Sequence, residues 1–238
     1  MSAQRPAAAE PQTTTRRSGC LSLIPAASRA RPAEGAAGRV SPPKALIAPH
    51  AGYIYSGPVA ANAYASLRPS RKTLRRVVLL GPAHRVYLRG MALPRADRFA
   101  TPLGEIPVDK ELEARASALP GVRYLDEAFA AEHSLEVHLP FLQSVLEEFT
   151  LLPVVVGDAP ADQVAGLLDA VWGGAETLIV ISSDLSHFHD YHTARKLDAE
   201  TAARIEALDK DRLGPEQACG CMPMHGLLEA ARARNMRV

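Results

Sequence analysis

Short apolar runs alternate with amphipathic stretches along most of this chain. The runs are rich in leucine and β-branched residues and are bounded by Gly, Pro or Ser, which is typical of strands buried on both faces of a parallel sheet. We expect such strands at 44–48, 76–80, 151–156 and 178–182. The remaining pattern predicts helices at 57–67, 109–118, 134–149, 161–172, 193–208 and 224–234, with an irregular or hairpin segment at 99–108.

Strands that alternate with helices at this spacing specify the α/β class, here a three-layer α/β/α sandwich with a mostly parallel central sheet. The chain has 238 residues, of which 47% are apolar, and this is enough for one such domain. Residues 1–43 differ from the rest, because they are rich in Ala, Pro, Arg, Ser and Thr with little apolar periodicity. We therefore expect a weakly structured segment over 1–43 and one α/β domain over 44–238.

Composition and charge limit which partners and which cellular compartment we expect. The net charge of +1 gives no reason to expect a nucleic acid or a membrane as partner. No apolar run approaches the length of a transmembrane helix. Three cysteines are too few for a disulfide framework, which predicts a cytoplasmic protein in a reducing environment.

Three of the predicted strands are each followed by a histidine. These are His50, His84 and His187, with Asp184 between the strand and the histidine in the third case. Ligands of open α/β sheets bind at the carboxyl ends of the strands, and imidazole is both a metal ligand and an acid–base group. Two histidines and a carboxylate would suit non-haem Fe(II), whereas a cysteine in place of the carboxylate would favour a softer metal. The alternative is that each histidine is a polar loop residue.

Glu132, His133 and Glu136 open the helix expected at 134–149 and could share one face of it. Their spacing is not that of the His-Glu-x-x-His motif, so a metalloprotease is not supported. Glutamate in a first turn also complements the helix dipole. A role for His133 or Glu136 depends on where that helix points, which local sequence does not fix.

A third cluster consists of Cys219, Cys221 and His225. Two thiols and an imidazole this close could bind zinc, but a closed structural site needs a fourth ligand. A single cysteine that reaches the strand-end histidines, or buried idle thiols, are the other interpretations. His189 and His192 either cap the following helix or face solvent.

Six motifs lie along the chain, at 49–57, 80–84, 101–104, 132–140, 182–187 and 218–220. They resemble those of Memo-family proteins and occur in the same order. The bacterial and archaeal members of that family are the Memo-like protein B of the AmmeMemoRadiSam system. The resemblance covers about residues 44–228, and six ordered motifs are far more specific than any one of them.

The resemblance implies a fold similar to class III extradiol dioxygenases of the LigB type, with a metal-binding cleft at the sheet edge. The positions that match the family's metal ligands are His50, His84 and Cys219. Those that match its surrounding polar site, and are the candidate catalytic residues, are His133, Asp184 and His187. The dioxygenases use two histidines and a glutamate, so the family resembles them with a cysteine substituted. Eukaryotic relatives are described as redox-active metal proteins and as signalling adaptors.

We therefore expect a cytoplasmic metal-binding protein and a candidate metal-dependent oxidoreductase that uses Fe(II) or copper, with zinc as a further candidate ion. The alternative is a non-catalytic module that binds a peptide or partner protein in the same cleft, to which Tyr53 and Tyr55 would contribute a rim. A zinc hydrolase with Asp184 or Glu136 as general base is a third interpretation.

The partners we expect are a small molecule or peptide in the cleft and, by resemblance, other AmmeMemoRadiSam proteins. Two departures from the family pattern accompany these expectations. The segment from Glu10 to about Arg31 does not continue the family's N-terminal motif, and the family's last strand has no counterpart before Val238.

Overall fold

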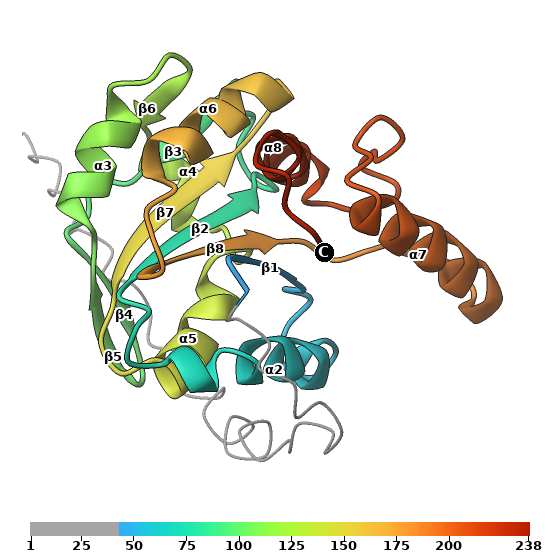
Figure 1. Ribbon diagram of the computed structural model, residues 1–238, viewed down its shortest axis with the longest axis horizontal. Helices are drawn as coiled ribbons and strands as arrows, with labels where there is room; N and C mark the ends of the chain where they lie inside the picture. Colours follow the sequence, from blue (N-terminus) through green and yellow to red (C-terminus); the bar gives the residue numbers. More distant parts are fainter. Residues whose placement is uncertain (1–42) are drawn as a thin grey trace, which may run out of the picture.

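A six-stranded sheet forms the centre of the fold (Figure 1). The computed structural model describes residues 43–238. The strand order is β1-β8-β2-β7-β3-β6, and every neighbouring pair is parallel except β3 with β7. The strands are β1 (Ala45–Ala48), β2 (Arg76–Pro82), β3 (Met91–Leu93), β6 (Val122–Tyr124), β7 (Thr150–Val156) and β8 (Thr177–Ser182).

Helices cover both faces of the sheet, which confirms the α/β/α sandwich (Figure 1). Successive side chains of a strand point to opposite faces, so each strand contributes to two apolar cores. In β2, Val78 and Leu80 pack with α3 (Lys110–Ser117), α6 (Ala161–Val171) and α8 (Cys221–Ala233). The alternate residues Val77 and Leu79 pack with α2 (Gly57–Ala65) and α5 (Leu139–Val145).

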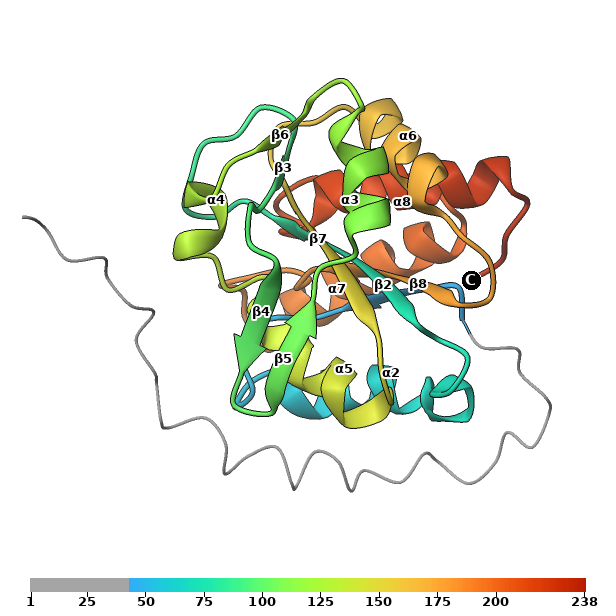
Figure 2. The same ribbon diagram turned by 90° about the vertical axis from the view of Figure 1, so that its left-hand side faces the viewer.

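The remaining elements lie around this sandwich. The antiparallel hairpin of β4 (Arg98–Thr101) and β5 (Gly104–Pro107) lies beside β7 (Figure 2). Short helices occur at η2 (Arg68–Ser70), α4 (Glu127–Ala130) and η3 (Glu136–His138). The helix α7 (Tyr191–Glu206) extends away from the layers (Figure 1), and Thr201 is its only buried residue.

All four predicted strands are confirmed, and so is the hairpin near 99–108. The continuous helix expected at 134–149 is wrong. Its first part is the 3-10 helix η3, the α-helix begins at Leu139 with Pro140 in its first turn, and the chain becomes extended at Leu146. The strands β3 and β6 were not expected, because three residues are too few to show a period. The expectation for 1–43 concerns residues outside the described part of the chain, apart from Pro43.

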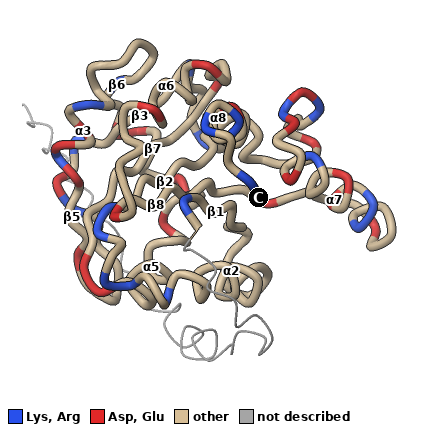
Figure 3. The backbone as a smooth tube through the Cα atoms, viewed as in Figure 1, with Lys and Arg blue, Asp and Glu red and all other residues tan. Residues whose placement is uncertain are grey.

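Acidic and basic residues are intermixed on the helices and in the loops (Figure 3). Basic residues gather from η2 to the start of β2, where Arg68, Arg71, Lys72 and Arg75 are exposed. Among the described residues, no helix combines the length and the apolar character that are needed to cross a bilayer.

Candidate metal centre

Three neighbouring strands deliver side chains to one edge of the sheet. β1, β8 and β2 lie side by side and run parallel. His50, Asp184 and His84 each follow the end of their own strand by two residues. The carboxyl ends of parallel strands share one edge, so these three side chains come together although they are distant in sequence.

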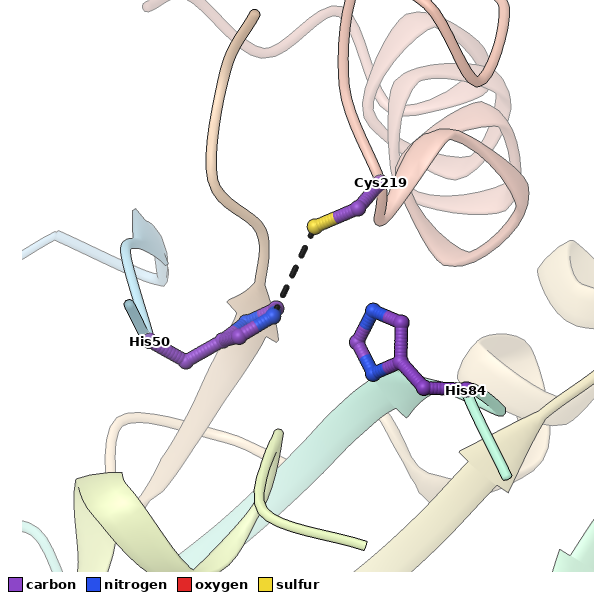
Figure 4. Close-up of side chains that lie close together, drawn as sticks. All are labelled: His50, His84 and Cys219. Carbon is purple, nitrogen blue, oxygen red and sulfur yellow. Dashed lines mark hydrogen bonds between the residues drawn. The ribbon is translucent and has the colours of Figure 1, made fainter. Parts of the chain in front are cut away.

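Cys219 joins this group from the opposite side, two residues before the start of α8 (Figure 4). The Cys219 Sγ atom lies 3.5 Å from His50 Nε2. One ligand atom from each of His50, His84 and Cys219 lies within 4.8 Å of the others. The backbone N–H of Asp184 also points at the Cys219 sulfur, at 3.3 Å.

The donor set fits a transition-metal ion. Zinc–sulfur bonds of about 2.3 Å and zinc–nitrogen bonds of about 2.1 Å at a tetrahedral angle place the two ligand atoms about 3.6 Å apart. The observed separation of Cys219 Sγ and His50 Nε2 is 3.5 Å. A thiolate with two imidazoles suits copper, zinc or iron, whereas magnesium and calcium prefer oxygen ligands.

His84 is oriented by a buried carboxylate. Glu132 Oε1 lies 2.9 Å from His84 Nδ1, and Glu132 Oε2 accepts the backbone N–H of His84 at 2.6 Å. Burial alone would raise the pKa of Glu132, but hydrogen bonds from His84 and from the Ser134 amide lower it to about 2. The ionised carboxylate can only accept, so His84 always carries a proton on Nδ1, and its Nε2 is directed at Cys219 (Figure 4).

His50 is held from two sides. Its Nδ1 atom lies 2.6 Å from Ser182 Oγ, on the last residue of β8. Asp184 Oδ1 accepts the backbone N–H groups of His50 and Ala51, at 2.9 and 3.0 Å. The second carboxylate oxygen, Oδ2, lies 3.6 Å from His50 Nε2 and 3.9 Å from His187 Nε2. Asp184 therefore fixes the loop after β1 and keeps one oxygen beside the candidate ligands.

The electrostatics of the group favour a thiolate beside an imidazolium. Burial opposes ionisation of Cys219, but hydrogen bonds with His50 and His84 lower the pKa of its thiol to about 6. Hydrogen bonds with Cys219 and Glu132 raise the pKa of His84 to about 9. The position of Cys219 at the N-terminus of α8 also favours negative charge. A deprotonated sulfur is the form that binds metal.

The site opens towards solvent on one side. The exposed fraction of the side chain rises from 1% for His50 and 13% for Asp184 to 29% for His84, 40% for His187 and 42% for His133. The His133 ring stacks on His84 with centroids 5.4 Å apart, and its edge meets His50 at 5.5 Å. A substrate could therefore reach the group past His133 and His187.

All six residues predicted from the sequence lie in this neighbourhood, in the overlapping groups His50/His84/Cys219, His84/Glu132/His133 and Asp184/His187/Cys219. Glu136 does not join them, because its side chain is exposed on η3.

The alternative zinc cluster is not assembled in the described part of the chain. His225 Nε2 hydrogen-bonds to the Leu213 carbonyl at 2.6 Å, and burial raises the pKa of the Cys221 thiol. Asp190, rather than His189 or His192, caps α7.

Sequence reasoning missed the residues that support the ligands. Glu132 was considered only as a helix-start residue, and Ser134, His138 and Ser182 were given no role. All four are buried polar residues within the matched motifs at 132–140 and 182–187. Their position inside those motifs was the available signal.

Comparisons with known sequences identify one and the same protein family. The profile of the family described as Memo-like protein matches residues 26–237. A MEMO1 family protein of Aquifex aeolicus is 36% identical over 200 residues, which are 80% of this chain and 73% of that protein. A MEMO1 family protein of Thermotoga maritima is 36% identical over 179 residues, 72% of this chain and 63% of that protein.

Protein MEMO1 of Mus musculus is 32% identical over 214 residues, 85% of this chain and 67% of that protein. The chain thus spans about two thirds of the length of these relatives. Among solved structures, the uncharacterized protein JW3007 from Escherichia coli K12 aligns with a TM-score of 0.48 at 17% identity, covering 71% of this chain and 81% of that one.

Proposed function

The chain belongs to the Memo-like family, and from this premise we propose that it binds one transition-metal ion through His50, His84 and Cys219 and acts as a metal-dependent oxidoreductase in the cytoplasm. The observation that carries the proposal is the 3.5 Å separation of Cys219 Sγ and His50 Nε2, which suits two ligands of one ion. Fe(II) or copper is the ion that we favour, because either would supply one-electron chemistry next to a bound substrate.

The chain's own residues supply the rest of the site. Glu132 and Ser182 orient the two ligand imidazoles, so that both Nε2 atoms face the thiolate. Asp184 Oδ2 and His187 Nε2, which lie 3.9 Å apart, would take a proton from a substrate and pass it to water. His133 forms a wall against the His84 ring.

Metal loading tests the ligand assignment. Protein purified anaerobically is loaded with Fe(II), Cu(I) or Zn(II), and the bound metal is counted in the wild type, His50→Ala, His84→Ala and Cys219→Ser. We expect one ion per chain in the wild type and a loss in each variant. The exposed His192 provides a matched control, and His192→Ala should bind as the wild type does. Equal binding in the wild type and His50→Ala would remove the proposal.

Turnover is tested separately, by oxygen uptake of the iron- or copper-loaded protein with ascorbate as electron donor. Asp184→Asn and His187→Gln should retain the ion and lower the rate. Loaded protein that consumes no oxygen under these conditions would contradict the oxidoreductase and leave the metal site standing.

A second candidate is a non-catalytic module that binds a peptide on the same face. Exposed apolar side chains that follow His50 and His187 in the sequence favour it, since Ile54 and Tyr55 are 76% and 81% exposed and Phe188 is fully exposed. Selection from a peptide display library, followed by binding to a variant that lacks His50, His84 and Cys219 together, tests this function. Affinity that survives the triple replacement would favour the module.

A further inference from the structure

A buried polar chain leads from the core of the protein to His50. Tyr64 OH lies 2.8 Å from His138 Nδ1, and His138 Nε2 lies 2.8 Å from Ser182 Oγ. Ser182 Oγ lies 2.5 Å from the Ser134 carbonyl oxygen and 2.6 Å from His50 Nδ1. Tyr64, Ser134, His138 and Ser182 are fully buried, so these groups must satisfy one another.

The direction of every hydrogen bond in this chain follows from one carbonyl group. The Ser134 carbonyl can only accept, so the single hydroxyl proton of Ser182 points at it. The Ser182 oxygen then has two lone pairs for two imidazoles, and it must accept from His138 Nε2–H and from His50 Nδ1–H. If His138 Nε2 or His50 Nδ1 carried no proton, its own lone pair would face a lone pair of the Ser182 oxygen.

The contact between Tyr64 and His138, at the buried end of this series of hydrogen bonds, is consistent with these directions. Burial lowers the pKa of His138 to about 3, so its ring is neutral and its Nδ1 carries a lone pair. Burial also raises the pKa of Tyr64 well above its ordinary value, so the phenol keeps the proton that it donates to His138 Nδ1. The Tyr64 ring is itself fixed by stacking on Phe141, with centroids 5.4 Å apart.

We propose that Ser182, whose hydroxyl is oriented by the Ser134 carbonyl, is the positioning residue that keeps a proton on His50 Nδ1 and so leaves His50 Nε2 to face Cys219. Two neighbouring acceptors favour the opposite tautomer of His50. Asp184 Oδ2 and Cys219 Sγ both lie within 3.6 Å of His50 Nε2 and would draw the ring proton to that atom. Losing the bond to the Ser134 carbonyl instead is unfavourable, because a buried acceptor would be left unpaired. The ligand role of His50 rests on the proposed function, whereas its protonation pattern does not.

Nitrogen-15 NMR of the metal-free, full-length chain tests this directly, because two-bond proton–nitrogen spectra show which ring nitrogen carries the proton. We expect a proton on His50 Nδ1, and His138 as the Nε2–H form. Tyr64→Phe should allow both tautomers of His138. Tyr53→Phe is the matched control, since that hydroxyl donates to the Val137 carbonyl, and it should leave both patterns unchanged.

Ser182→Ala should move the His50 proton to Nε2 and weaken zinc binding by about 10–100-fold. Thr177→Val removes another buried hydroxyl from the opposite end of β8 and should bind zinc as the wild type does. A wild-type His50 with a bare Nδ1 would overturn the inference, whether or not Ser182→Ala folds. The expected NMR pattern in a wild type that binds none of Fe(II), Cu(I) and Zn(II) would uphold it and defeat only the proposed function.

Discussion

The carboxylate of Glu132 holds both the ring and the backbone of His84. One oxygen lies 2.9 Å from His84 Nδ1, and the other accepts the His84 amide at 2.6 Å. The first oxygen also accepts the Ser134 amide at 2.9 Å. The loop after β2 is thereby attached to the segment before η3, and one ligand imidazole gains an ionised partner that raises its basicity.

Glu132→Gln should weaken zinc binding by about 10–100-fold. A carboxamide has one acceptor oxygen, so it cannot accept all three N–H groups that converge on Glu132. Zinc affinity is measured by competition with a chelator. Glu136→Gln changes an exposed glutamate near the same segment and should have no effect. Wild-type affinity in Glu132→Gln would show that this carboxylate does not support a metal ligand.

Cys219 should react as a thiolate at neutral pH. In Cys20→Ser/Cys221→Ser it is the sole cysteine, and its rate of alkylation by iodoacetamide should rise with a midpoint near pH 6, where the pKa of its thiol lies. In the matched variant Cys20→Ser/Cys219→Ser, the thiol of Cys221 has a raised pKa and should stay slow. A midpoint for Cys219 near pH 9 would contradict the thiolate–imidazolium pair.

The ionisation of His84 and Cys219 should change the free energy of unfolding little between pH 6.5 and 9. The pKa of His84 is raised from 6.5 to about 9, so its stabilisation is complete below pH 6.5 and is lost as pH rises through 9. The pKa of Cys219 is lowered from 9.0 to about 6, so its stabilisation is complete above pH 9 and is lost as pH falls through 6. The two slopes have opposite signs and offset each other. Urea unfolding of the metal-free protein at several pH values measures this, and His84→Ala should restore a rise of stability with pH.

Zinc affinity, by contrast, should rise with pH up to about 9. A metal ion must displace the proton that His84 holds at neutral pH, whereas the Cys219 thiol is already ionised. We expect about one proton to be released per zinc bound at pH 7.5, measured with an indicator dye in weakly buffered solution. Zinc binding without proton release would mean that His84 is neutral before the metal arrives.

The ends of the strands could be predicted from the sequence, but the support of the ligands could not. β1, β2 and β8 are continuous apolar runs, and parallel strand ends share an edge, so His50, His84 and His187 are candidates from the local pattern. The choice of His50 and His84 as the ligands came from the resemblance. Cys219 came from the resemblance, since nothing local says that the start of α8 faces that edge. Glu132 and Ser182 depend on how the segment before η3 packs across the ends of β2 and β8, which is a long-range contact without a period in the sequence.

The close approach of Gly220 to β8 should set the position of Cys219. A Cβ atom at Gly220 would lie 2.4 Å from the Ser182 carbonyl oxygen and 2.6 Å from Ser183 Cβ. Gly220→Ala should therefore destabilise the fold by about 1–3 kcal/mol in urea unfolding and weaken zinc binding more than tenfold, because the loop must move. Gly166→Ala, in α6 with nothing within 4 Å, should stabilise by about 0.5–1 kcal/mol and leave zinc binding unchanged. Normal zinc affinity in a destabilised Gly220→Ala would show that the thiolate is positioned by other contacts.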